Sequence, residues 1–223
     1  MEFLASGRDS VVYAINDRRV LRCAEYDTTD VAQVMRYLRD QGYPVPAVYH
    51  AEGGDIEMER LHGPTLAEEV VSGRVSPAAC VELIRELHSD LHRIEPPAWL
   101  AARSRGVDLT GGGADRVLHL DLHPENIMLT EGGPVVIDWT NAAAGDPDID
   151  RAVTWAVFAG FDPTPLGPEL AAGFDRMLDQ LLDGLPQGAL DTAHRYRQLD
   201  PTLEAAERHR LRTRFEQAGS AHG

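Results

Sequence analysis

The sequence contains no lysine. All 21 basic residues are arginine, so any mechanism that elsewhere depends on a lysine is either excluded or has to use a guanidinium group. Arginine keeps the positive charge, but it presents a planar fork of donors where lysine presents a compact point charge.

Cysteine is scarce as well. Cys23 and Cys80 have no motif spacing, and we expect both to be reduced core residues. No run of about 18 apolar residues occurs, so a transmembrane helix is not expected. The first residues, MEFLASGRDS, lack the basic-then-apolar pattern of a secretion signal. These features predict a cytoplasmic protein with no membrane partner.

Acidic residues outnumber basic residues, 36 to 21, and the net charge is −15. That balance argues against nucleic acid as a partner. It favours a cationic ligand through electrostatic steering, although solubility alone also explains an acidic surface. With 223 residues, of which 43% are hydrophobic, the chain can form one large or two small domains with a sizeable core.

The most informative stretch is residues 117–141, which reads VLHLDLHPENIMLTEGGPVVIDWTN. An apolar strand leads into a polar loop, and a second apolar run and a Gly-Gly-Pro turn lead to another strand. This order places Asp121, Asn126 and Asp138 at the ends of short buried strands. A carboxylate in such a place needs a partner, and a metal ion is one such partner.

The spacing of these three residues suits phosphoryl transfer from ATP. Asp121 can accept the proton of a substrate hydroxyl, and Asn126 can offer an amide oxygen to Mg²⁺. Asp138 can hold the same ion and bridge two phosphates. Positioning, charge neutralisation and an oriented nucleophile are what this reaction needs.

The segments HLDLHPEN at 119–126 and IDW at 137–139 resemble the aminoglycoside phosphotransferase and choline kinase group. The resemblance implies an α+β, bilobal protein-kinase-like fold. Residues 1–61 would form an N-terminal nucleotide-binding lobe with a small antiparallel sheet. Residues 62–223 would form a mainly helical C-terminal lobe with the catalytic loop and the substrate site.

The activity that the resemblance implies is transfer of the ATP γ-phosphate, with Mg²⁺, to a hydroxyl of a small molecule. The acceptor would be aminoglycoside-, macrolide- or choline-like. Asp121 would be the catalytic base, and Asn126 and Asp138 would hold the metal. His123 stands where protein kinases place a phosphate-contacting lysine, so we expect it to reach the γ-phosphate.

The N-terminal segment reads as three strands, with a tight loop between the first two. Backbone N–H groups of Gly7, Arg8 and Ser10 can approach phosphates there, although a plain hairpin is the alternative. In the family the third strand carries a lysine paired with a glutamate of the next helix. Arg22 takes the lysine position here, but Val31 stands where the glutamate is expected.

The segment around Glu59 and Leu61 would, by the same resemblance, be the hinge between the lobes. Backbone groups of both residues would meet the adenine edge. That contact requires no particular side chain, so an ordinary linker remains the alternative.

Ser76 and Pro77 start a predicted helix to about residue 94, whose His88 and His92 we interpret as structural. Asp146 and Asp150 follow the catalytic segment, and the resemblance gives them a bracing role. Residues 95–116 read as a long loop, and the chain beyond residue 160 reads as helical.

Two other functions remain open. The first is a nucleotide-binding pseudokinase without catalysis, which the arginine at position 22 and the missing glutamate suggest. The second is a zinc hydrolase, because His119, Asp121 and His123 would share one face of an extended strand. Pro124 disfavours a strand there.

Overall fold

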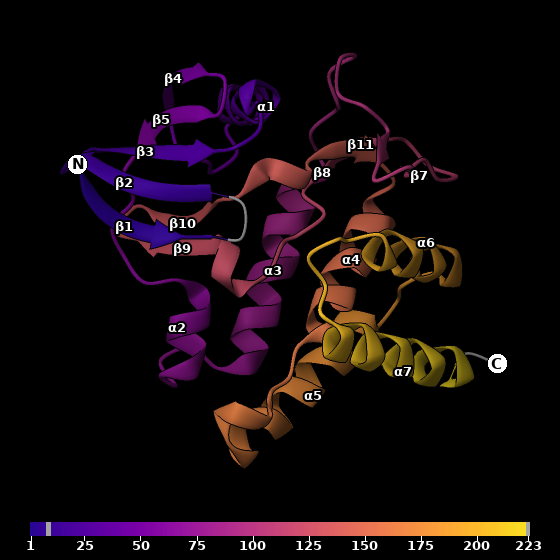
Figure 1. The fold of residues 1–223 in the computed structure, drawn as a ribbon. Helices are drawn as coiled ribbons and strands as arrows, with labels where there is room; N and C mark the ends of the chain where they lie inside the picture. Colours follow the sequence, from indigo (N-terminus) through magenta and orange to yellow (C-terminus); the bar gives the residue numbers. More distant parts are fainter. Residues whose placement is uncertain (8–9, 222–223) are drawn as a thin grey trace. The chain divides into compact units, whose positions relative to one another are not determined.

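The structure is a computed structural model that describes residues 1–7 and 10–221, with its elements labelled in Figure 1. It contains two compact units. Unit 1 consists of Met1–Leu66 with Glu125–Ala142, and unit 2 of Ala67–Pro124 with Ala143–Gly223. The hairpin that follows the catalytic loop thus belongs with the N-terminal residues. The lobes expected from the sequence, 1–61 and 62–223, stay a prediction.

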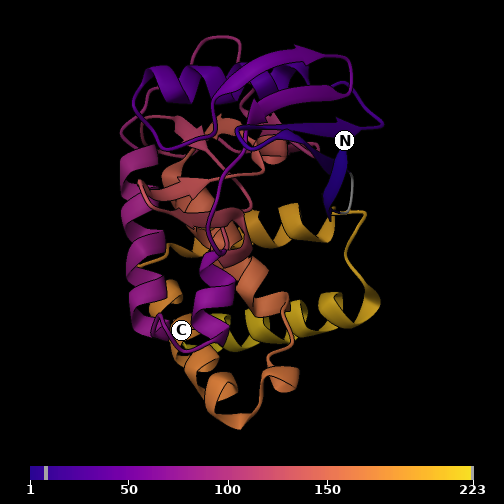
Figure 2. The same ribbon diagram turned by 90° about the vertical axis from the view of Figure 1, so that its left-hand side faces the viewer.

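Unit 1 is built on an antiparallel sheet with the strand order β1-β2-β3-β5-β4. Its strands are β1 (Glu2–Ser6), β2 (Ser10–Asn16), β3 (Arg19–Ala24), β4 (Val48–Glu52) and β5 (Asp55–Glu59). The helix α1 (Thr29–Asp40) packs against β4, beside the sheet in Figure 2. It buries an apolar stripe that includes Met35 and Leu38, because apolar residues recur at helical spacing. In β3 the alternate residues Val20 and Arg22 are buried, which gives this strand one buried face.

A second hairpin completes unit 1. It pairs β9 (Ile127–Thr130) with β10 (Gly133–Val136). The Leu129 N–H donates to the Pro64 carbonyl at 2.8 Å, which ties this hairpin to the segment after β5. Gly63 has φ +141°, and a Cβ there would lie 2.0 Å from the Leu129 carbonyl oxygen. Only glycine allows that close approach.

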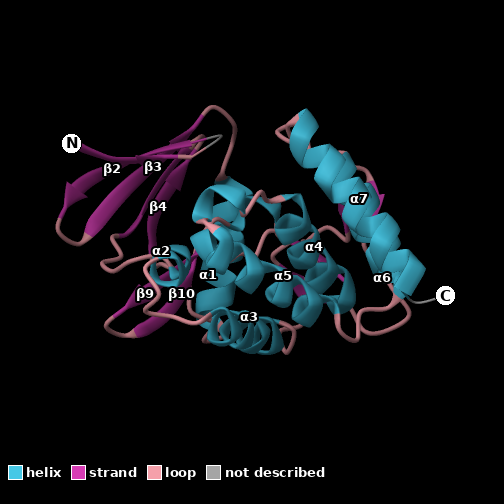
Figure 3. Cartoon of the chain, turned by 90° about the horizontal axis from the view of Figure 1, so that it is seen from below, coloured by secondary structure: helices cyan, strands magenta, loops and turns pink. Residues whose placement is uncertain are grey.

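Unit 2 is mainly helical, as the cyan helices α3 to α7 in Figure 3 show. Its helices are α2 (Leu66–Val71, whose first residue belongs to unit 1), α3 (Pro77–Leu91), α4 (Pro147–Gly160), α5 (Pro168–Leu182), α6 (Gln187–Gln198) and α7 (Ala205–Ala221), with the 3₁₀ turn η3 (Thr164–Leu166) before α5. α4 packs against α5, α6 and α7 and is buried over most of its surface. It is therefore the central helix of this core.

Residues 95–116 contain more structure than the predicted long loop. A small hairpin pairs β6 (Arg103–Ser104) with β7 (Val107–Asp108). Its two turn residues, Arg105 and Gly106, both have positive φ, at 50° and 77°. Two such residues suit the tight turn of a two-residue hairpin, and arginine gives little sequence signal for one.

The α+β class expected from the sequence is confirmed, with the sheet in unit 1 and most helices in unit 2. Among the residues that the structure describes, no helix is both long and apolar enough to cross a membrane.

Candidate active site

Asn126 and Asp138 lie at the same end of the β9–β10 hairpin in unit 1. In its register Ile127 faces Val136, and the next N–H, that of Ile137, donates to the Asn126 carbonyl at 3.0 Å. Asn126 is buried in the 3₁₀ turn η1 (Pro124–Asn126), whereas the Asp138 side chain is 48% exposed. The hairpin therefore places the backbone of Asn126 beside that of Ile137, the residue before Asp138, although Asn126 and Asp138 are twelve residues apart in the sequence.

Asp138 has a strained backbone, with φ 60° and ψ 69° in the left-handed region. It precedes the 3₁₀ turn η2 (Trp139–Asn141). Trp139 anchors the turn. Its Nε1–H donates to the Val136 carbonyl at 3.1 Å, and its ring packs edge-to-face against the Tyr43 ring, with 5.6 Å between the ring centroids. Strain of this kind persists where the surroundings hold it, and it is concentrated at functional sites.

Arg22, on β3, is buried and points its guanidinium group at polar side chains of unit 1. Its Nε donates to Ser10 Oγ, and its Nη2 donates to the Tyr26 and Thr140 hydroxyls, all at 3.1 Å. The same Nη2 lies 4.0 Å from Asp138 Oδ1. Within the described residues, the buried Nη1 makes no hydrogen bond.

The lysine–glutamate pair that the resemblance implies is not present on β3 and α1. Val31 occupies α1 where the glutamate was expected, and no ion pair joins Arg22 to α1 within the described part of the chain. Among the described residues, the carboxylate that pairs with Arg22 is that of Asp138, in the segment after β10.

The tight loop before β2 is only partly described. The Gly7 N–H donates to the Ser10 carbonyl at 2.8 Å, which closes the loop. Ser10 also accepts the hydrogen bond from Arg22. Arg8, a predicted phosphate-binding residue, lies outside the described residues.

Glu59 and Leu61 lie at and just beyond the end of β5. The Glu59 N–H donates to the Ala47 carbonyl at 2.8 Å, and its Oε2 accepts the Ala47 N–H at 3.0 Å. The Glu59 N–H is therefore already used inside unit 1, and an adenine ring would have to use other backbone groups of this segment.

The loop that carries Asp121 follows β8 (Arg116–Leu118) in unit 2. Leu120 has φ 61°, and the Asp121 N–H donates to His119 Nδ1 at 3.2 Å. His119 is fully buried, and His123 Nε2 lies 3.8 Å from Asp121 Oδ2. A left-handed conformation is uncommon for a leucine, so the backbone of this loop turns at Leu120 under some strain.

A buried carboxylate holds this loop. Asp150, on α4, accepts the Leu120 N–H at Oδ1 (2.7 Å) and the His119 N–H at Oδ2 (3.0 Å). The same Oδ2 also accepts from His92 Nε2 at 3.0 Å. Asp146 acts at the start of α4, where its side chain accepts the Asp148 N–H. The two acidic residues thus fix the loop backbone and the helix that braces it.

The charge states of this buried cluster follow from its contacts. Burial alone would raise the pKa of Asp150, but the hydrogen bond from His92, the nearby imidazoles and the His119 N–H outweigh it and hold this pKa far below its usual range. Burial lowers the pKa of His88 to about 3, so its imidazole is neutral at neutral pH. His88, His92 and Asp150 lie close enough to share a metal ion. Because three N–H groups already use the Asp150 oxygens, we interpret the cluster as a hydrogen-bonded brace.

The zinc-hydrolase alternative does not fit the structure. It needs His119, Asp121 and His123 on one face of a strand, but β8 ends at Leu118. Within the described residues, these three do not form a group that could share an ion, whereas His88, His92 and Asp150 do.

Sequence reasoning missed a buried arginine beside the predicted base. Arg197, on α6, lies with its Nη1 3.9 Å from Asp121 Oδ1. About 75 residues separate the two in the sequence, and Arg197 follows the helical pattern of its own segment. No local signal could have joined them, because the contact depends on how α6 packs in unit 2.

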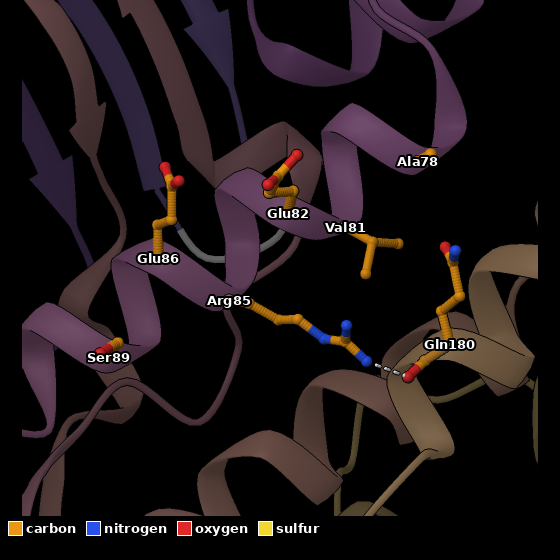
Figure 4. Close-up of a pocket in the computed structure, with 7 residues that line it drawn as sticks. All are labelled: Ala78, Val81, Glu82, Arg85, Glu86, Ser89 and Gln180. Carbon is orange, nitrogen blue, oxygen red and sulfur yellow. Dashed lines mark hydrogen bonds between the residues drawn. The ribbon is translucent and has the colours of Figure 1, made fainter.

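A surface recess between α3 and α5 lies outside this set of residues (Figure 4). Glu82, Arg85 and Glu86 line it from α3, and Gln180 faces them from α5. Arg85 Nη2 donates to the Gln180 carbonyl at 2.5 Å. None of the predicted site residues lines this recess.

Residues 96–190 match the model of the phosphotransferase enzyme family. The family resemblance is thereby confirmed. The matched segment contains Asp121, Asn126 and Asp138, the residues on which the phosphotransferase interpretation depends. A comparison with curated proteins gives no match.

Solved phosphotransferase structures resemble the whole chain. The aminoglycoside phosphotransferase APH(2'')-Ib, determined with ADP bound, is 17% identical over 97% of this chain and 90% of its own, with a TM-score of 0.59. An ethanolamine kinase of Plasmodium vivax is 14% identical over 98% and 82%, with a TM-score of 0.61. A choline/ethanolamine kinase family protein of Mesorhizobium loti is 14% identical over 99% and 87%, with a TM-score of 0.57. At these identities the likeness shows the fold, which is the predicted protein-kinase-like fold.

Proposed function

We propose that the chain transfers the γ-phosphoryl group of ATP to a hydroxyl of a small molecule. The family match over residues 96–190 supports a phosphotransferase. The observation that carries the ATP-dependent reaction is the position of Asn126 and Asp138 at one end of the β9–β10 hairpin, where the Asn126 carbonyl accepts the N–H of Ile137, the residue before Asp138. The two residues follow a braced Asp121 by five and seventeen positions. A base and two oxygen ligands in this order are what the reaction needs.

Asp121 acts on the acceptor in this proposal. The acceptor oxygen forms a bond to the γ-phosphorus while the bond from that phosphorus to the β,γ-bridging oxygen breaks, and ADP leaves. The acceptor proton passes to the Asp121 carboxylate. The N–H groups of His119 and Leu120 donate to Asp150 and fix the backbone of this loop. Asp121 is therefore already in position before the reaction begins.

Asn126 and Asp138 fit a magnesium ion. Both offer hard oxygen donors, the ligand type that Mg²⁺ prefers. Asp138 is half exposed, and its backbone is held in a strained conformation by the Trp139 anchor. A bound Mg²⁺ would neutralise phosphate charge at this end of the hairpin.

Arg22 binds phosphate in this proposal, in place of the lysine that the chain lacks. Its buried Nη1 makes no hydrogen bond within the described residues, and a phosphate oxygen is a suitable partner for such a donor. Backbone N–H groups of the segment Gly7, Arg8 and Ser10 would supply further donors, and the Gly7 N–H would have to exchange its bond to the Ser10 carbonyl for a phosphate oxygen. His123, beside Asp121, would contact the γ-phosphate.

The adenine ring is assigned to the segment of Glu59 and Leu61. Because the Glu59 N–H is bonded to Ala47, we assign the contact to the Glu59 carbonyl and the backbone of Leu61. Similar solved structures support nucleotide binding without indicating the segment that contacts the adenine: one APH(2'')-IIa structure contains ATP, and one APH(4)-Ia structure contains AMP-PNP.

The acceptor is proposed to be a small, cationic hydroxyl compound. Two similar structures are complexes of APH(2'')-IIa with streptomycin and with gentamicin, and a third is the Plasmodium vivax ethanolamine kinase. The net charge of −15 would attract such cations. Amino alcohols, aminoglycosides and macrolides are therefore the first acceptors to try.

Calorimetric titration with ATP, first with Mg²⁺ and then with EDTA, tests the nucleotide site. We expect binding that Mg²⁺ strengthens. An acceptor panel then follows ADP release, and Asp121→Asn should lower turnover by about 10²-fold while leaving ATP binding unchanged. Glu125→Gln, an exposed carboxylate in the same loop, is the matched control and should keep full turnover. ATP binding without transfer to any acceptor would identify a pseudokinase, and no ATP binding would refute the proposal.

A further inference from the structure

A buried arginine lies beside the proposed base. Arg197 is 5% exposed, and its Nη1 lies 3.9 Å from Asp121 Oδ1. At that distance the two groups attract as charges, but they do not share a good hydrogen bond. The guanidinium therefore supplies a fixed positive charge on one side of the Asp121 carboxylate.

Arg197 is fixed by two other carboxylates of unit 2. Its Nη1 lies 3.1 Å from Asp200 Oδ2, and its Nη2 donates to Glu207 Oε1 at 3.0 Å. Asp200 itself is buried and accepts the N–H and the hydroxyl of Thr202. Both terminal nitrogens of the guanidinium are therefore bonded to carboxylates other than Asp121, and these bonds fix the position of its charge.

The β6–β7 hairpin joins the same network. Arg105, in its turn, lies 3.1 Å from Asp200 Oδ2, and its guanidinium carbon stacks 4.5 Å from the centre of the Tyr196 ring. The left-handed φ of Arg105, 50°, is part of the turn that places it there. The network therefore links three separate parts of unit 2 to the loop of the base.

Stability alone does not account for the buried charges around Arg197. Burying a charged pair requires desolvation, and apolar side chains of similar size often do as well or better. Within the described residues, the buried Nε of Arg197 also makes no hydrogen bond, which is unusual for a purely structural arginine. A role in orienting the neighbouring Asp121 carboxylate would explain why an arginine stands at this buried position.

We propose that Arg197 is a positioning residue that orients the Asp121 carboxylate toward the acceptor hydroxyl, with Asp200 and Glu207 holding the guanidinium in place. The inference rests on the proposed phosphotransferase function. It assigns a role to α6 that the sequence alone did not suggest.

Steady-state kinetics of Arg197→Met and Arg197→Lys test this role. We expect Arg197→Met to lower kcat by about 10-fold or more, because misplacing a catalytic group is costly, and to leave the Kd for Mg·ATP unchanged. Arg197→Lys keeps a charge and should recover part of the loss. Arg85→Met removes an exposed arginine from the α3–α5 recess and should behave as wild type.

A double-mutant cycle with Asp121→Asn shows whether Arg197 acts through the base. If it does, Arg197→Met should lower the residual rate of Asp121→Asn by less than about twofold, since residues that act as a unit are not additive. Should Arg197→Met not fold, Arg197→Lys and Asp200→Asn provide the same comparison. A variant that binds ATP with the wild-type Kd and has a cooperative thermal unfolding curve is counted as folded.

Each outcome bears on one of the two proposals. A wild-type kcat in Arg197→Met, or an equal loss in both backgrounds, would overturn the positioning role while the phosphotransferase stands. A wild-type protein that transfers phosphate to no acceptor would overturn both. A loss of kcat that Arg197→Met causes when Asp121 is intact, but not in the Asp121→Asn variant, supports the inference.

Discussion

Arg22 and Asp138 are joined through a hydroxyl. Nη2 of Arg22 and Oδ1 of Asp138 are 4.0 Å apart, and the Thr140 hydroxyl accepts from Arg22 at 3.1 Å and donates to Asp138 at 2.7 Å. Arg22 comes from β3, and the other two follow β10. Arg22, the proposed substitute for the family lysine, is therefore oriented by the proposed metal-binding segment, although α1 has no glutamate at the expected position.

Removing the Arg22 guanidinium should weaken nucleotide binding. We expect Arg22→Met to raise the Kd for Mg·ATP by about 10-fold or more, because a charge-assisted contact to phosphate is lost. Arg22→Lys should fall between wild type and Arg22→Met, since an ammonium cannot reproduce the planar fork. Calorimetry measures both values.

Arg19→Met is the matched control for that experiment. Arg19 lies on the same strand, but it is exposed and pairs with Glu57 at 2.6 Å. It should keep the wild-type Kd. Equal effects at the two positions would show that general positive charge, and not the Arg22 site, attracts the nucleotide.

Asp138→Ala should abolish the strengthening of ATP binding by Mg²⁺. The variant removes one of two proposed oxygen ligands, and Asn126 alone is a poor site for a hard divalent ion. Titrations with Mg²⁺ and with EDTA should then give the same Kd. Glu131→Ala, at the other end of the same hairpin and exposed, should keep the Mg²⁺ dependence. A Mg²⁺ effect that survives in Asp138→Ala would remove Asp138 from the metal site.

Elements with strong local signals could be predicted from the sequence. The helix expected to start at Ser76 and Pro77 does so, and the Ser76 hydroxyl caps it by accepting the Ala79 N–H at 3.2 Å. The three strands expected in the N-terminal segment are present as β1, β2 and β3, because alternating β-branched residues and tight turns are local features.

Features that depend on packing could not be predicted. The strand expected after the Gly-Gly-Pro turn is β10, and it ends at Val136, shortly before the left-handed Asp138 and the Trp139 anchor turn the chain. The ion pair of Asp121 with Arg197 joins distant segments. The partner of Arg22 was sought on α1, where family analogy placed it, and it lies after β10.

Asp150→Asn should destabilise the fold and the catalytic loop together. The carboxylate accepts three N–H groups in a fully buried place, and an amide can replace only part of that capacity. We expect a loss of about 3 kcal/mol in the free energy of unfolding, measured by urea denaturation. Asp148→Asn, in the first turn of the same helix, loses an i,i+3 pair with Arg151 and should cost about 0.5 kcal/mol or less. Similar losses in both variants would contradict the bracing role.

The buried His88 should make stability depend on pH. Its pKa is lowered by burial to about 3 in the fold, against about 6.5 when unfolded. Between these values the unfolded chain binds a proton that the folded chain does not. The free energy of unfolding should therefore fall as the pH drops below about 6.5, by up to about 1.4 kcal/mol per pH unit. Burial also lowers the pKa of His194, which adds to the effect in the same direction.

His88→Gln isolates this contribution. Urea denaturation at several pH values between about 4.5 and 7.5 gives the slope, and this window lies above the range in which Asp150 is protonated in the unfolded chain. We expect a shallower slope in His88→Gln, whatever its stability at neutral pH, because one proton uptake on unfolding is lost. His50→Gln, which removes an exposed imidazole, should run parallel to wild type. A slope in His88→Gln equal to that of wild type would mean that His88 is protonated inside the fold, and that the imidazole faces Asp150 as a cation at 3.8 Å.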